Sequence, residues 1–136
     1  MNYEKQKKLE QTNLVLTVLE ETFSIHRLAP DASLPETISE CDFYSLSKTA
    51  DELSLVCPEN LAVISKKHSP DWKCLKVSGP LDFKLTGIIA GITDVLSKER
   101  ISVFVISTFD TDYILIKKQN LTNAVSELEG AGYQIN

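Results

Sequence analysis

The 136-residue sequence has few of the residues that mark catalysis, metal binding or disulfide-linked folds. Its two histidines, His26 and His68, lack the spacing of a metal pair, and its three cysteines form no C-x-x-C arrangement. This pattern argues against a disulfide framework or a zinc site. Strings of the G-x-S-x-G, Walker A and H-E-x-x-H kinds are also missing. Cys57 or Cys74 could pair with His26 as nucleophile and base, but no oxyanion loop accompanies them. We therefore expect no enzyme activity, no cofactor and no bound metal, and we interpret His26 as a strand-surface residue.

An excess of positive charge and long apolar runs are missing as well. Lys and Arg together number 14 against 19 Asp and Glu, which gives a net charge of -5. Such a chain has no surplus of cations to contact nucleic acid or an anionic membrane. No apolar run approaches the ~20 residues of a membrane span, and the charged N-terminus lacks the apolar core of a signal peptide. We expect a cytoplasmic protein that binds neither nucleic acid nor membrane.

What is present is an ordinary globular composition, with 43% hydrophobic and 24% charged residues. The length favours one compact unit or two very small subdomains. The strand and helix patterns divide the chain into a polar tail (1–12), a strand-rich and helix-poor N-terminal unit (13–71) and a regular C-terminal unit (72–136).

The N-terminal unit is predicted to consist mainly of paired strands. Residues 14–19 and 23–28 alternate in the manner of a hairpin, and residues 42–48 and 52–57 form a second strand pair. The segment 32–41 contains few periodic positions, so we expect a loop with at most a short helical piece. Pro58 precedes a stretch, 60–67, that we predict as one weak helix.

The C-terminal unit is predicted as strand, helix, hairpin, helix and strand stub. The first predicted helix has one apolar face, formed by Leu85, Ile88, Ile89, Ile92, Val95 and Leu96. Strands are expected at 72–78, 101–106 and 113–116, with a polar turn at 109–112. A second helix begins near Asn120, a good N-cap, and ends at Gly130 and Gly132. Residues 133–135 leave room for only a stub of the last strand, whose edge the N-terminal hairpin or a partner chain would complete.

Polar groups gather where these elements begin and end. Thr86 and Gly87 lie at the helix entry, where unpaired backbone N–H groups attract anions, and 107–112 lie at the far end of the strand that the helix feeds. A carboxylate could meet the helix start and an ammonium could meet Asp110 or Asp112, which is the polarity of a free amino acid. The alternative is that both aspartates only shape the turn.

The stretch LTGIIAGITDVLSKERISVFVISTFDTDYILIKKQNLTNAVSELEGAGY resembles the ACT domain, a small-molecule-sensing βαββαβ module. It is most similar to the tandem-ACT amino-acid sensors, such as the animal cytosolic arginine sensors, and to the regulatory domains of aspartate kinases. Upstream, DFYSLSKTADELSLVCPEN and WKCLKVSGP resemble the first half of the same compact proteins. The implied fold is α+β, with tandem ferredoxin-like units, the first degenerate, and antiparallel sheets with helices on one face.

The resemblance also implies a function and a site. It implies an allosteric sensor that binds a free amino acid and acts on a protein partner in trans. From the truncated last strand and the frequency of two-fold assembly we also expect a homodimer. The implied ligand-binding residues are Leu85, Thr86, Gly87, Ser107, Thr108, Phe109, Asp110 and Asp112. Because helix starts tolerate other residues, we expect Gly87→Val to block the carboxylate while leaving the fold intact. The alternative is that Gly87 only allows the helix to pack closely on the sheet, in which case Gly87→Val would destabilise the protein with or without ligand. The alternative function is a structural or protein-interaction module without a small ligand.

Overall fold

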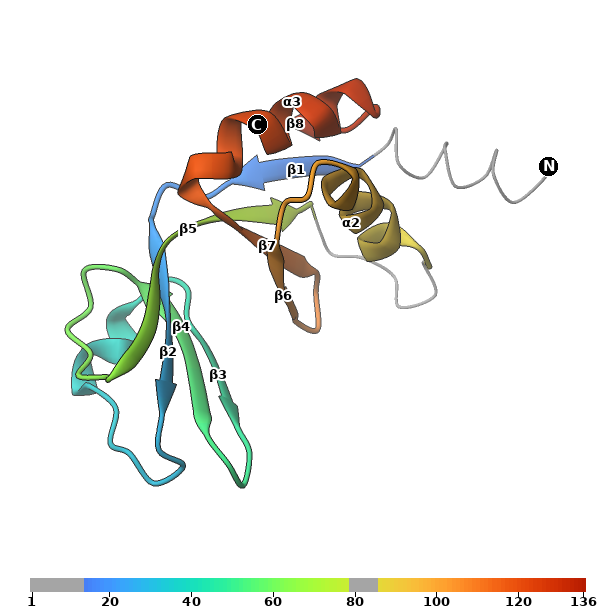
Figure 1. Cartoon of the computed structure of the whole chain (residues 1–136). Coiled ribbons are helices and arrows are strands. Elements are labelled where there is room, and N and C mark those ends of the chain that lie inside the picture. Colours follow the sequence, from blue (N-terminus) through green and yellow to red (C-terminus); the bar gives the residue numbers. More distant parts are fainter. Residues whose placement is uncertain (1–13, 79–85) are drawn as a thin grey trace. The chain divides into compact units, whose positions relative to one another are not determined.

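The computed structural model describes residues 14–78 and 86–136, and these residues form two compact units. We call residues 20–72 the N-terminal unit, and residues 14–19 together with 73–136 the C-terminal unit. The eleven-residue strand β5 (Lys67–Val77) contributes residues to both (Figure 1). Residues 14–19 thus group with the C-terminal residues, whereas the sequence-based boundaries grouped them with the N-terminal ones. The predicted polar tail lies outside the described residues.

The N-terminal unit contains an antiparallel sheet in the order β3-β4-β2-β5. Its other strands are β2 (Phe23–Leu28), β3 (Ser45–Lys48) and β4 (Leu53–Pro58), and the short 3-10 helix η1 spans Glu36–Glu40. The predicted β3–β4 hairpin is confirmed. Its turn is closed by Thr49, whose backbone N–H donates to Glu52 O at 2.9 Å and whose hydroxyl accepts the N–H of Asp51 and of Glu52 at 3.1 Å.

Two predictions for this part of the chain are wrong. Residues 60–67 form no helix; inward and outward positions alternate there, with Leu61, Val63 and Ser65 partly buried and Ala62 and Ile64 exposed. This two-residue period is that of extended chain, and it lets Leu61 and Val63 pack on the buried cluster of Leu28, Leu53, Leu55 and Cys57.

The second wrong prediction is the hairpin of residues 14–28. Both segments are strands, but β1 (Val15–Val18) pairs with residues 75–77 of β5, while β2 pairs with residues 67–72 of the same strand. Because β5 is long enough to accept a different partner along each half, the two N-terminal strands pair with it instead of with each other.

The C-terminal unit contains strands in the order β8-β1-β5-β7-β6. Strands β6 (Val103–Ser107) and β7 (Asp112–Lys117) form the predicted hairpin, and β8 (Gln134–Ile135) is the predicted stub. β1 lies antiparallel to β5, and β8 lies parallel to β1. Strand β1 therefore lies between β5 and the stub β8. It completes the edge that the sequence analysis assigned to the N-terminal hairpin or to a partner chain.

Helices α2 (Ile88–Lys98) and α3 (Leu121–Gly130) cover one face of this sheet. Ile92 and Leu96 of α2 and Leu128 of α3 are fully buried in one cluster with alternate residues of the strands, including Leu75, Val77, Ile114 and Ile116. The predicted α+β fold, antiparallel strands with helices on one face, is confirmed. Leu85, Gly79 and Pro80 lie outside the described residues.

The two ends of α3 differ from each other in how they are capped. Asn120 is the N-cap residue, as predicted, but it has helical backbone angles, makes no side-chain capping bond and ends the 3-10 turn η2 (Lys118–Asn120). At the other end Gly132 has φ 103, and the N–H of Tyr133 donates to Leu128 O at 3.1 Å. That bond and the positive φ are features of a glycine-terminated helix.

The two glycines at the end of α3 should respond oppositely to substitution by alanine. Gly130 is helical, and an added Cβ would meet nothing within 4 Å, so Gly130→Ala should stabilise the protein by up to about 1 kcal/mol. Gly132→Ala places a side chain at positive φ and should cost about 1–2 kcal/mol. Urea denaturation of both variants measures the difference, and equal effects would contradict the cap.

Candidate functional site

The turn between β6 and β7 is held by two threonines. The backbone N–H of Thr108 donates to Thr111 O at 2.8 Å, and the Thr108 hydroxyl donates to the same oxygen at 3.0 Å and accepts the N–H of Thr111 at 3.3 Å. Phe109 and Asp110 are thereby presented at the tip, and the Phe109 side chain is 80% exposed. The turn itself is fixed while its two central side chains face outward.

Below the tip, Ser107 and Asp112 lie directly opposite each other as the last pair of the hairpin. The Ser107 hydroxyl donates to Asp112 Oδ1 at 2.5 Å. A hydroxyl that donates its proton retains lone pairs, and a carboxylate has several acceptor positions. The pair therefore presents acceptors of hydrogen bonds and negative charge, the chemistry that suits an ammonium or guanidinium group.

The start of α2 presents the opposite polarity. Gly87 is the N-cap with φ 79, and its carbonyl accepts the first helical bond, from the N–H of Gly91 at 2.9 Å. The next N–H groups have no partner within the helix, and Gly87, at the N-cap, has no side chain that could accept a hydrogen bond from them. Such an end favours an anion, and Thr86 beside it is exposed.

The backbone of Gly87 overturns one expectation from the sequence. Positive φ is readily adopted by glycine but strained for a β-branched residue. Gly87→Val would therefore disturb the helix start whether or not a ligand is bound. Asparagine tolerates this conformation, so Gly87→Asn is the substitution that adds a side chain at lower backbone cost.

Thr111 links the β6–β7 turn to β5 through a hydrogen bond, and the sequence analysis did not predict this role. Its hydroxyl donates to the carbonyl of Val77, the last residue of β5, at 2.7 Å, and the residue is 4% exposed. The β6–β7 turn therefore lies at the carboxyl end of β5, the strand that leads on to α2. A threonine between two aspartates has the composition of a turn, and its partner is 34 residues away, so no local signal marks its role.

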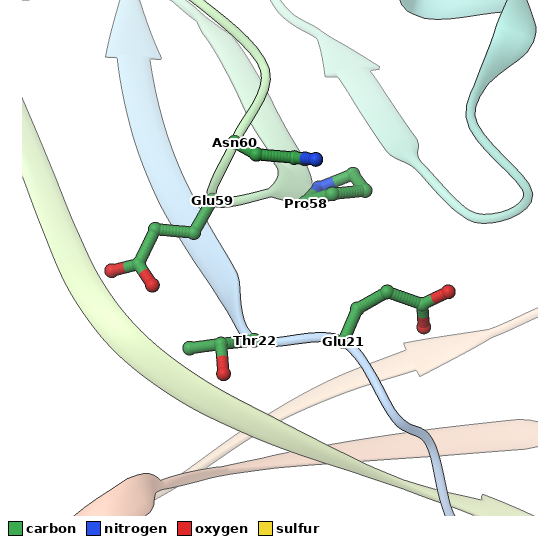
Figure 2. Close-up of a pocket in the computed structure, with 5 residues that line it drawn as sticks. All are labelled: Glu21, Thr22, Pro58, Glu59 and Asn60. Carbon is green, nitrogen blue, oxygen red and sulfur yellow. The ribbon is translucent and has the colours of Figure 1, made fainter.

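A separate pocket of about 450 Å³ lies in the N-terminal unit and was not predicted. It is lined by Glu21, Thr22, Pro58, Glu59 and Asn60, and the N–H of Glu59 donates to Thr22 O at 2.8 Å. Figure 2 shows that the two glutamate side chains point away from each other. Because its charged groups do not converge on one point, the pocket lacks the arrangement that orients a polar ligand.

The N-terminal unit also contains a buried histidine, so the interpretation of His26 as a surface residue is wrong. His26 is 6% exposed; its Nε2 is 2.8 Å from Ser24 Oγ and its Nδ1 is 2.6 Å from Ser65 Oγ. Both ring nitrogens are thus engaged. Cys57, opposite Ser24 in β4, is fully buried and burial raises the pKa of its thiol, the reverse of an activated nucleophile.

His26 gives the N-terminal unit a defined acid sensitivity. Burial, and then the nearby His68 whose ring stacks on it at 5.7 Å, lower the pKa of His26 below its usual value. As the pH falls below about 6.5, the unfolded chain takes up a proton that the folded chain refuses. We expect stability to fall in that range, and His68→Gln to raise the His26 pKa and lessen the loss.

NMR titration of His26 and thermal unfolding between neutral and acidic pH measure both effects. Lys118→Gln, which removes an exposed charge in the other unit, is the control and should leave the His26 pKa unchanged. A His26 pKa at or above the usual value would contradict the role of burial.

Among the described residues, no group of three or more His, Cys, Asp or Glu side chains could hold a metal ion. Within the same ranges, the helices are too short or too polar to cross a membrane.

Family models match both parts of the chain. A model described as an ACT domain matches residues 67–130, and a model of an N-terminal domain matches residues 21–66. A protein from Agrobacterium tumefaciens whose crystal structure is known has 33% sequence identity to this chain. The match covers 90% of this chain and 92% of that protein, and the two structures superpose with a TM-score of 0.81.

Relatives with named functions match more distantly. The cytosolic arginine sensor for mTORC1 subunit 1 of Pongo abelii is 28% identical over 127 residues, which covers 85% of this chain but 38% of the sensor. The regulatory subunit of aspartate kinase from Thermus thermophilus shares the fold, with a TM-score of 0.59, 9% identity, and 85% and 95% of the two chains covered. The chain spans less than two thirds of the length of the curated relatives that it matches.

Proposed function

We propose that this chain is a regulatory domain related to amino-acid sensors, because residues 67–130 match the ACT domain model and a cytosolic arginine sensor is among its relatives. We propose further that it binds a free amino acid at the β6–β7 turn of its C-terminal unit. The observation that carries the proposal is the pairing of Ser107 with Asp112 at 2.5 Å, at the end of β5 that leads to α2. We propose that these acceptors and the start of α2, the next described element after β5 in the chain, form the two halves of one site.

The two ends of an amino acid match these two groups. The uncapped N–H groups after Gly87 would hold the carboxylate. Asp112 together with the Ser107 hydroxyl would accept hydrogen bonds from the ammonium or from a basic side chain. Thr86, Thr108 and Phe109 complete the proposed site among the described residues; Leu85, also expected from the sequence, lies outside them.

Asp110 and Asp112 have different surroundings, which suggests different roles. Asp112 is partly buried and its Oδ1 already accepts the Ser107 proton, whereas Asp110 is exposed at the tip of the turn. A fixed, partly buried carboxylate suits orientation of a ligand, and an exposed one contributes charge at lower cost in solvation. We assign orientation of the cation to Asp112 and longer-range attraction to Asp110.

The regulatory action follows from the family rather than from any catalytic group. We propose that occupancy of the site changes how ACT units pack and that a cytoplasmic protein partner in trans reads this change, without catalysis by the chain. The name of the arginine sensor makes arginine the first ligand to test. The alternative is an interaction module with the same fold and no small ligand.

Amino-acid binding should appear as thermal stabilisation. A ligand at 100 times its dissociation constant adds about 2.7 kcal/mol to the folded state, which shifts the melting midpoint by several degrees for a chain of this size. We expect one or more common amino acids, tested singly at millimolar concentration, to produce this shift. Asp112→Ala and Gly87→Asn should each abolish it, whereas Asp42→Ala, which removes an exposed acid from the N-terminal unit, should not.

The absence of a melting shift and of a calorimetric signal with every amino acid would favour the alternative module. A response retained in both site variants would move the site away from the turn.

We also propose that the protein is a homodimer joined through the β6 edge. Among the described strands β6 pairs only with β7, and Val105 on it is 37% exposed. A strand edge with apolar side chains is a template for pairing, and two-fold assembly is the commonest outcome. Light scattering should return twice the chain mass of 15.2 kDa, and Val105→Lys should return the monomer mass. A monomer of the unsubstituted protein at micromolar concentration would refute this.

A further inference from the structure

We infer that Thr111 is a positioning residue, whose buried hydroxyl fixes the β6–β7 turn in the geometry that the amino-acid site requires. The inference rests on the proposed function for its consequence, but its structural part can be measured without a ligand. It concerns a residue that contacts no ligand in the proposed site.

The hydroxyl of Thr111 joins two segments that are distant in sequence. It donates to the carbonyl of Val77 at 2.7 Å, and the two residues are 4% and 0% exposed. Water therefore has little access to this bond. A buried carbonyl that loses its donor cannot recover a partner from solvent, so the backbone must shift or remain unsatisfied.

The backbone of the same residue holds the rest of the turn. Its carbonyl accepts the N–H and the hydroxyl of Thr108, and its N–H donates to that hydroxyl. The next residue, Asp112, accepts the hydrogen bond of Ser107. A shift of Thr111 would displace both the turn and this acceptor pair, and binding sites lose affinity when supporting contacts leave their groups loose.

Two substitutions separate the hydroxyl from the shape of the side chain. Thr111→Val keeps the branched shape and removes the donor, whereas Thr111→Ser keeps the donor. Ile116→Val, in the fully buried core of the same unit, lowers stability without touching the turn and is the matched control for a purely structural effect.

Hydrogen exchange of the Thr108 amide by NMR tests the positioning in the ligand-free protein. That amide donates to Thr111 O at 2.8 Å, so we expect its exchange to be about tenfold faster in Thr111→Val than in Thr111→Ser or Ile116→Val. Equal exchange in all three variants would overturn the inference whether or not an amino acid binds.

Titration with the panel of common L-amino acids tests the consequence for the site. We expect affinity for the amino acid that stabilises the unsubstituted protein most to fall about tenfold or more in Thr111→Val and to be kept in Thr111→Ser and Ile116→Val. Unchanged affinity in Thr111→Val would show a structural bond only and overturn the positioning role. If no amino acid binds the unsubstituted protein, the proposed function fails, and the exchange experiment still decides whether Thr111 holds the turn.

Discussion

The pairing of one long strand, β5, is the constraint on which the rest of the structure depends. Its first half pairs with β2 and its second half with β1 and β7. Asp71 adopts φ 63 within this strand, and the register with β2 shifts between Phe23 and Ile25. Irregular pairing of this kind increases the local twist of a strand. The single strand β5 therefore contributes residues to both units, and β1 and β2 both pair with it.

Polar side chains lie near the end of β5 because the middle of the sheet is occupied by buried apolar side chains. Along β7 the residues Ile114, Leu115 and Ile116 are completely buried, so no polar side chain could lie there without a partner. Strand ends and helix starts are where backbone groups lack regular partners. Thr111 satisfies one such group, the carbonyl of Val77, with its own hydroxyl. The residues of the proposed site thus lie at the last ladder pair of the β6–β7 hairpin, in its turn and at the start of α2.

Local patterns predicted most of the C-terminal unit, because each of its elements has a period and a boundary of its own. The apolar face of α2 and the β6–β7 hairpin were evident from spacing alone. Non-local pairing was not: the partner of β1 lies at residues 75–77, and the contact of Thr111 depends on a strand 34 residues away. Residues 60–67 were predicted as a helix, but Leu61 and Val63 follow the two-residue period of extended chain. That period is too short to recognise without the sheet on which both side chains pack. Likewise His26 was predicted at the surface because its partners are not evident from the sequence. Ser24 and Ser65 hydrogen-bond with its two ring nitrogens and allow it to be buried.

Selectivity among amino acids would depend on a contact with the side chain of the ligand. The ammonium and the carboxylate are common to all amino acids, so the acceptors of Ser107 and Asp112 and the donors of the α2 start would recognise the class without distinguishing its members. A side chain would have to be recognised by a third surface. Phe109, apolar and 80% exposed beside Asp110, offers both an aromatic face and a neighbouring charge, a combination that favours a cationic side chain over a neutral one. Because that surface points outward from the turn, a second ACT unit facing it would both enclose the ligand and receive the signal, which links the choice of ligand to the packing of the units.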